Sequence, residues 1–309
     1  MITDGVLVIN KPQNWTSHDC VAVCRKALGI KRIGHGGTLD PMAEGVLPIF
    51  IGRATRIMQY MDMDYKSYEC RVKLGISTET QDIWGEVISI RDTEKISKID
   101  ILRAAESFKG YIEQKPPKYS ALKVKGKKLY EYARSGIEVE IKPRKVYIKE
   151  MVTENIDMEK MELSFKVTCS KGTYIRAICN DLGEMLGCGA AMSYLKRTGS
   201  GVFNLDNSLT PDDVKNMKAE DMENYIFPVD YPLIHFSRAE LKRDRAVYFA
   251  SGNSIRWSQV NAGINTETED KKKYKVYQAE NGKFLGIGYY NREKDELKAD
   301  KIFVTRQEI

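Results

Sequence analysis

The segment from residue 34 to residue 45, GHGGTLDPMAEG, contains the carboxylate best suited to chemistry. Asp40 precedes Pro41, which biases its backbone toward an extended conformation, and the nearby glycines permit close approach of a large ligand. An aspartate presented in this way could act as a nucleophile. Residue type alone leaves the point open, because an Asp-Pro pair in a glycine-rich loop also forms turns and His35 also fits an ordinary polar loop position.

Other common chemistries lack their motifs in this chain. We find no G-x-x-x-x-G-K-[ST] phosphate loop, no G-x-G-x-x-G between a strand and a helix, and no G-x-S-x-G elbow. The six cysteines are spread thinly, as in a reduced cytosolic protein. His18, Cys20 and Cys24 are the one local group of possible metal ligands, but they lie on an expected helix where the cysteines fit its buried face. We therefore expect no metal.

A cluster of cations and aromatic side chains lies between residues 116 and 136. Its members are Lys123, Lys125, Lys127, Lys128, Tyr119, Tyr130 and Tyr132. Lysines mixed with aromatic rings suit the phosphates and unstacked bases of RNA. A solvated charged surface explains this cluster equally well when it is taken alone.

The composition is that of a globular protein with more than one structural unit. The 309 residues exceed the usual size of a single domain, and 42% are hydrophobic while 30% are charged. Lysine and arginine outnumber aspartate and glutamate by 49 to 43, which is compatible with a polyanionic partner. No apolar run approaches the ~20 residues that span a bilayer, and the N-terminus lacks the pattern of a secretory signal, so we expect a cytoplasmic protein.

Elements that could position Asp40 follow from the hydrophobic pattern. Strands are predicted at about 6–9, 46–51, 68–76, 86–90, 146–155 and 161–169, and helices at about 17–28, 99–108, 128–134 and 174–186. Because these elements show no regular alternation of strand and helix, we expect an α+β fold with a mainly antiparallel mixed sheet flanked by helices.

A second, smaller unit is predicted after the prolines at 228 and 232. Residues 275–277, 284–289 and 302–304 are strand-like, and Asn281-Gly282 is suited to a hairpin turn. The end of the chain therefore indicates a small β-rich domain.

Five strings, in order, give this chain a family resemblance. They are GVLVINKPQNWTSHD, GHGGTLDPMAEGVLPI, KSYECRVKLG, PPKYSALKVKGKKLYEYARSGI and CSKGTYIRAICNDLGEMLGCGA. Together they resemble the TruB family of tRNA pseudouridine synthases over residues 5 to 205, and the tail is similar to a PUA domain. The resemblance implies a catalytic domain over 1–230 with an RNA-binding insertion at about 110–142, and a PUA-like RNA-binding domain over 231–309.

The resemblance also implies roles for individual residues. It makes Asp40 the catalytic carboxylate, Tyr68 the active-site tyrosine and Arg176 the arginine that pairs with Asp40 and keeps it ionised despite burial. The remaining residues expected to bind RNA are His35, Tyr174, Leu195, Lys11, Lys123 and Lys125. By residue type alone, Tyr68 and Leu195 fit a packed core equally well and Arg176 fits a surface charge.

The function implied by the resemblance is isomerisation of uridine 55 in the T-loop of tRNA to pseudouridine. The base would be flipped out of its stack, and the partner would be the T-arm of tRNA. We expect a monomer that needs no cofactor and no membrane. Two alternatives stay open: a guide-RNA-dependent pseudouridine synthase, and a non-catalytic RNA-binding protein with the same fold.

The chain departs from the family pattern at a few positions. Asn14 stands where glycine is usual, a change that a left-handed turn tolerates because asparagine also visits that region. Gly36 replaces a common threonine, and Lys196 and Gly199 stand where arginine is frequent. None of these departures affects Asp40, Tyr68 or Arg176.

Overall fold

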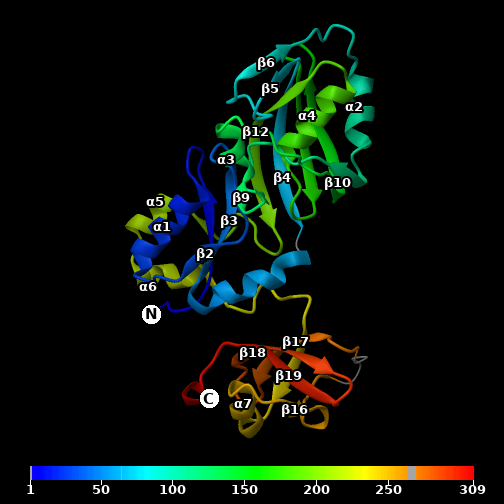
Figure 1. Ribbon diagram of the computed structural model, residues 1–309. Coiled ribbons are helices and arrows are strands. Elements are labelled where there is room, and N and C mark those ends of the chain that lie inside the picture. The colour runs from blue at the N-terminus through cyan, green and yellow to red at the C-terminus, as the bar shows by residue number, and fades with distance from the viewer. Residues whose placement is uncertain (1, 64, 264–268) are drawn as a thin grey trace.

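The computed structural model describes residues 2–63, 65–263 and 269–309 (Figure 1). Its largest element is a ten-stranded sheet in the order β13-β1-β3-β12-β4-β11-β10-β7, with β14 beside β1 and β2 beside β3. The pairs β1 with β13 and β3 with β12 are parallel, and the other described pairs of this sheet are antiparallel. The predicted α+β class with a mainly antiparallel sheet is confirmed.

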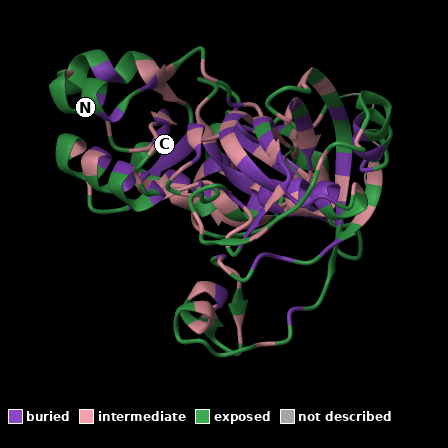
Figure 2. Cartoon of the chain, turned by 90° about the horizontal axis from the view of Figure 1, so that it is seen from above, coloured by how far each residue is buried: buried purple, intermediate pink, exposed green. Residues whose placement is uncertain are grey.

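The strands of the large sheet are β1 (Gly5–Lys11), β2 (Ile33–His35), β3 (Glu44–Ile51), β4 (Lys66–Leu74), β7 (Gly110–Gln114), β10 (Arg144–Asp157), β11 (Glu162–Cys169), β12 (Ala190–Ser200), β13 (Ser208–Leu209) and β14 (Ile226–Phe227). Five of these strands, β1, β3, β4, β10 and β11, were predicted from the sequence, whereas β2, β7, β12, β13 and β14 were not. Strand β3 is buried along nearly its whole length, which is why its sequence is continuously apolar rather than alternating. Figure 2 shows the buried residues concentrated in the middle of this sheet.

Helices cover one face of the sheet. Helix α4 (Ile175–Met185) packs on β12 and β4, and α2 (Lys98–Glu106) packs on β10 (Figure 1). Helix α1 spans Ser17–Leu28. Thr16 is its N-cap, since the Thr16 side chain accepts a hydrogen bond from the Asp19 amide, and Gly29 is its C-cap, with a left-handed φ of 66°. The shorter helices are α3 (Leu129–Arg134), α5 (Pro211–Asn216), α6 (Ala219–Met222) and η2 (Glu223–Tyr225).

Two hairpins extend from the large sheet. Strands β5 (Ile76–Thr78) and β6 (Val87–Ile90) form one, and β8 (Lys123–Val124) with β9 (Lys127–Lys128) forms the other. The second hairpin leads directly into α3, so the lysine-rich segment is an ordered projection.

The C-terminal residues form a separate five-stranded sheet in the order β15-β17-β18-β19-β16. Its elements are β15 (Ser237–Leu241), α7 (Arg243–Ala250), β16 (Ile255–Arg256), η3 (Trp257–Gln259), β17 (Lys273–Gln278), β18 (Phe284–Asn291), β19 (Glu296–Ile302) and η4 (Arg306–Glu308). The hairpin turn at Asn281-Gly282 is confirmed, since β17 and β18 pair antiparallel across it. The strand predicted at 302–304 is wrong, because β19 ends at Ile302.

A segment absent from the sequence prediction joins the two sheets. It is the 3₁₀ segment η1 (Gly52–Met63), in which Ala54, Ile57 and Tyr60 are buried at a spacing of three residues, the period of a 3₁₀ helix. These side chains share a hydrophobic cluster with residues from both sheets. Its other members include Val6, Val8, Val46 and Phe50 from the large sheet and Leu233, Ile287 and Phe303 from the C-terminal part.

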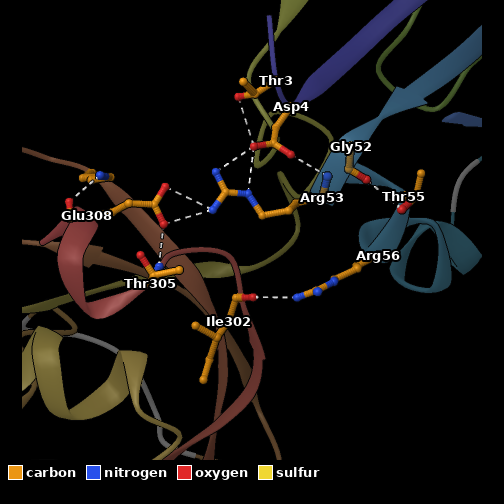
Figure 3. A network of polar contacts seen from close by, with 10 residues as sticks. Thr3, Asp4, Gly52, Arg53, Thr55, Arg56, Ile302, Thr305 and Glu308 are labelled. Atoms are coloured by element: carbon orange, nitrogen blue, oxygen red, sulfur yellow. Dashed lines mark hydrogen bonds and ion pairs between the residues drawn. The ribbon is translucent and has the colours of Figure 1, made fainter. Parts of the chain in front are cut away.

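Polar contacts reinforce this joint (Figure 3). Arg53 Nη2 lies 2.7 Å from Asp4 Oδ2, and Arg53 Nη1 lies 3.2 Å from Glu308 Oε2. Arg56 donates to the Ile302 carbonyl at 3.0 Å, and Tyr60 donates to Asp300 at 2.9 Å. The C-terminal sheet is thus packed against the large sheet through η1. Among the described residues, no helix is long and apolar enough to cross a membrane.

Candidate active site

Asp40 lies in the loop between β2 and β3, and hydrogen bonds fix the backbone on both sides of it. The hydroxyl of Ser17, at the start of α1, accepts from the Leu39 amide at 2.9 Å and donates to the Leu39 carbonyl at 3.2 Å. The Ala43 amide donates to the Asp40 carbonyl at 3.0 Å. The loop is therefore held by a helix that sequence alone would not place beneath it.

Asn14 supports the same loop from the other side. Its amide donates to the Pro41 carbonyl at 2.9 Å. Its φ of 64° is left-handed, which agrees with the expectation that asparagine replaces the family's glycine at a left-handed position. Gly36 also has a local explanation, because a Cβ there would lie 2.6 Å from the Phe50 ring.

Lys11 is buried beneath the loop and is 0% exposed. Its ammonium donates to the carbonyls of Pro12 at 2.9 Å, Trp15 at 2.7 Å and Pro41 at 3.1 Å. Burial lowers the pKa of Lys11 to about 8, although the nearby charges of Asp40 and Glu44 oppose the change. The resemblance implied that Lys11 contacts RNA. In this structure its ammonium instead donates hydrogen bonds to three backbone carbonyls.

Arg176, near the start of α4, makes the ion pair with Asp40. Its Nε lies 2.8 Å from Asp40 Oδ2, and its Nη1 and Nη2 donate to the carbonyls of Thr80 at 2.7 Å and Tyr119 at 3.0 Å. The Arg176 side chain is 6% exposed, while that of Asp40 is 41% exposed. The expectation of a buried Asp40 is therefore wrong for the protein without RNA: the cation is buried and the carboxylate faces outward.

A second carboxylate shares this arginine. Asp82 Oδ2 lies 3.7 Å from Arg176 Nη1, and Asp82 Oδ1 accepts from the Thr80 hydroxyl at 2.7 Å and the Trp84 amide at 3.2 Å. Asp82 lies in the turn between β5 and β6, which is thereby attached to the site. The buried guanidinium of Arg176 thus contacts two carboxylates and two backbone carbonyls, which compensate for the burial of its charge.

Tyr68 and Arg197 face each other on neighbouring strands, since they are register partners of β4 and β12. Arg197 is fully buried; its Nε donates to the Val46 carbonyl at 2.7 Å and its Nη2 to the Gly37 carbonyl at 3.1 Å. The positive charge of Arg197 acts on the Tyr68 hydroxyl. Burial raises the pKa of Tyr68, and Arg197 opposes this only in part, so Tyr68 is a neutral phenol at pH 7.

The structure brings the other expected site residues to the same end of the sheet in different settings. His35 ends β2, and its ring packs edge-on against His18 at 5.3 Å; burial lowers the pKa of His35, which favours the neutral ring. Tyr174 is the residue before α4, and its amide and carbonyl are both bound by the Gln114 side chain, at 2.8 Å and 3.0 Å. Leu195 is buried in β12 opposite Cys70.

The lysine-rich hairpin is linked to the site through its base. Lys123 and Lys125 are exposed, and Lys125 occupies the turn with a φ of 48°. Tyr119, at the base of this segment, supplies the carbonyl that Arg176 binds. The hairpin segment and Asp40 therefore both contact Arg176. Within the described part of the chain, no group of three or more His, Cys, Asp or Glu residues could hold a metal ion.

Three residues at this site escaped the sequence prediction. They are Ser17, Asp82 and Arg197. Ser17 offered only a capping signal and Asp82 only a turn signal. Arg197 is flanked by Lys196 and Thr198 in β12, a strand that the sequence pattern did not predict, so no local signal indicated a buried cation there.

Comparisons with known proteins find matches over most of the chain. Residues 25–175 match the family model described as TruB family pseudouridylate synthase (N terminal domain), and residues 176–234 match the tRNA pseudouridylate synthase B C-terminal domain. The chain is 42% identical over 97% of its length to the tRNA pseudouridine synthase B of Clostridioides difficile (strain 630), of which it covers 99%.

Further similarity extends to another relative and to a solved structure. The tRNA pseudouridine synthase B of Clostridium kluyveri is 44% identical over 97% of this chain and 100% of its own length. The crystal structure of a Cbf5-Nop10-Gar1 complex contains a chain with a TM-score of 0.73 at 25% identity, covering 98% of this chain and 86% of that one. The similarity therefore spans both sheets.

Proposed function

Because the chain belongs to the TruB family of pseudouridylate synthases, we propose that it isomerises uridine 55 in the T-loop of tRNA to pseudouridine, with Asp40 as the catalytic carboxylate. The observation that carries this proposal is the 2.8 Å ion pair between Arg176 Nε and Asp40 Oδ2, beside the buried Tyr68. An outward-facing carboxylate held by a buried cation is oriented before the substrate arrives, so little reorganisation is needed during the reaction.

The reaction is balanced without a donor or an oxidant. The bond from N1 to the ribose C1′ breaks, and a bond from C5 to C1′ forms after the base rotates. The proton on C5 leaves to solvent, and N1 takes up a proton. Asp40 supplies the anionic oxygen that assists glycosidic bond breaking, and Arg176 holds that oxygen in place. A base inside a folded T-loop must first be extruded, at a cost of roughly a few kcal/mol.

Tyr68 then acts as a neutral phenol. Its ring covers the extruded uracil and replaces the lost stacking, and Arg197 lies opposite it on the neighbouring strand. A raised pKa disfavours a phenolate, so this arrangement supports a stacking and hydrogen-bonding role rather than that of an ionised base. Leu195 and Tyr174 complete the walls of the pocket, and His35 fills the loop of the RNA.

The remaining RNA contacts involve two projections of the fold. The lysine-rich hairpin with Lys123 and Lys125 holds phosphates of the T-arm, and the C-terminal sheet, over residues 231–309, acts as a PUA-like RNA-binding domain. Lys11 contributes indirectly, since its ammonium fixes the backbone next to Asp40. We place the enzyme in the cytoplasm, where its substrate is made, as a monomer that needs no cofactor or metal.

A guide-RNA-dependent synthase on the same fold is the alternative. The tRNA-modifying relatives are more similar in sequence than the Cbf5 chain, at 42% against 25% identity. Incubation of the purified protein with an unmodified tRNA transcript decides between them. Formation of pseudouridine without added RNA supports independent action, and a strict need for a guide contradicts it.

The decisive experiment measures release of tritium from tRNA that carries C5-labelled uridine. Asp40→Asn should abolish release and leave tRNA affinity within about tenfold, because affinity comes from phosphate and loop contacts. Asp212→Asn is the matched control, since Asp212 is an exposed carboxylate paired with Lys215 on α5. Turnover near the wild-type rate in Asp40→Asn would refute the assignment.

A further inference from the structure

Three tyrosines lie in a row at one end of the large sheet. Tyr111 and Tyr147 are register partners on β7 and β10, with ring centroids 4.8 Å apart. Tyr65, just before β4, continues the row, with its ring 6.4 Å from that of Tyr147. Tyr111 is 70% exposed and Tyr65 is 39% exposed. This tyrosine row is contiguous, unlike the single exposed apolar residues common on protein surfaces.

Two lysines accompany the rings. Lys145 Nζ lies 4.3 Å from the centre of the Tyr111 ring, and Lys149 Nζ lies 5.1 Å from that of Tyr65. Both lysines are exposed, and they alternate with Tyr147 along β10, so all three side chains share one face of the strand. The exposed Lys171 follows Ser170, which hydrogen-bonds both the amide and the carbonyl of Tyr147. Rings and cations are therefore interleaved.

The tyrosine row lies on the face of the large sheet opposite to Tyr68, at the same end of the sheet. Val146 and Ile148 are buried toward the helix-covered face, so Tyr147 between them points to the opposite face. Tyr65 precedes Tyr68 by three residues, which is roughly 10 Å along an extended chain. An RNA bound at Asp40 could reach the tyrosine row by passing around this end of the sheet.

Cross-strand packing alone does not account for the row. A pair of opposed tyrosines stabilises two neighbouring strands, which would explain Tyr111 and Tyr147. It does not explain Tyr65, which lies outside β4, or the lysines held over the rings. We propose that the tyrosine row is a stacking surface for unpaired nucleotides of RNA, with Lys145 and Lys149 contacting the flanking phosphates.

The relative strengths of a cation–π contact and of base stacking favour replacement of the lysine over each tyrosine ring by an RNA base. An exposed cation–π contact shifts an equilibrium by only about two- to fivefold. A base stacked on an aromatic side chain contributes roughly 5- to 150-fold in affinity. A base can therefore displace the lysine from the ring, and the released ammonium is free to pair with a phosphate. The inference rests on the proposed function only in taking RNA as the bound molecule.

The test uses the full-length protein and a fluorescently labelled oligoadenylate about eight nucleotides long, a length typical of such sites. Fluorescence anisotropy measures its affinity for the wild type and for two double variants. Tyr111→Ala with Tyr147→Ala should weaken binding by roughly 5- to 150-fold for each ring removed. Tyr111→Phe with Tyr147→Phe keeps both rings and should bind within about twofold of the wild type.

Further measurements separate a structural effect from lost stacking. Thermal unfolding shows whether the alanine variant is folded at the temperature of the binding assay. If it is not, Tyr65→Ala, outside the strands, replaces it with the same expected loss. Lys145→Gln with Lys149→Gln should reduce the salt dependence of binding by up to about 0.7 in log–log slope per phosphate contact. A folded alanine variant that binds like the wild type overturns the proposal, as does a wild type that does not bind.

The oligoadenylate also keeps this inference distinct from the proposed reaction, because it contains no uridine and cannot be isomerised. Ring-dependent binding of oligoadenylate by a protein that leaves uridine in tRNA unchanged would refute the proposed function and leave the stacking surface standing. The reverse result, turnover with ring-independent binding, would overturn only the stacking surface.

Discussion

Raising the pH from about 7 to about 9.5 should stabilise the wild-type protein relative to a Lys11→Met variant. The pKa of Lys11 is about 8 in the fold against 10.5 for the free side chain. Between these two values the unfolded chain binds more protons, so the free energy of unfolding rises with pH. With these pKa values, linkage gives a gain of about 2 kcal/mol at pH 9.5 and almost none at pH 7.

The measurement is urea unfolding of both proteins across this pH range. Other titrating groups are common to the two proteins and cancel in the difference, and so does any constant cost of leaving the carbonyls of Pro12, Trp15 and Pro41 without a donor. A difference that stays constant within about 0.5 kcal/mol, or that changes in the opposite direction, would refute the reasoning. It would mean that the ammonium beneath Asp40 keeps its hydration in the folded protein.

Three further predictions concern Arg197, the lysine-rich hairpin and the C-terminal sheet. Arg197→Lys should lower the single-turnover rate by about tenfold or more, since an ammonium does not reproduce the planar fork; an unchanged rate would contradict the role given to Arg197. Glutamine at all four hairpin lysines should reduce the salt dependence of tRNA binding by up to about 0.7 to 0.9 in slope per lost phosphate contact; an identical slope would make the hairpin a solvated surface. These lysines are Lys123, Lys125, Lys127 and Lys128. A chain ending at Phe227 should unfold at a lower temperature, since Leu233, Ile287 and Phe303 contribute about 1.5–3 kcal/mol each when buried; equal melting temperatures would show that the C-terminal sheet is not needed for the fold.

Local features of the fold were predictable because their causes are local. The start of α1 at Thr16, its end at Gly29 and the turn at Asn281-Gly282 depend on side chains within a few residues of the backbone they fix. The buried strand β3 was visible in its continuous apolar run. The 3₁₀ segment η1 was missed, because it is stabilised by packing against both sheets, including Ile287 and Phe303 more than two hundred residues later in the chain.

The site divides in the same way. The sequence by itself determined that Asp40 lies in a glycine-rich loop before proline, and the ordered motifs determined the family. Only the tertiary structure showed that Arg176 pairs with Asp40 while remaining buried. It also showed that Asp82 pairs with the same arginine and that a second buried cation, Arg197, lies near the site. These side chains come from distant parts of the chain, and the strand order β3-β12-β4 brings them together. The long-range pairing of strands, which residue spacing does not encode, is the physical reason that this geometry could be seen only in the fold.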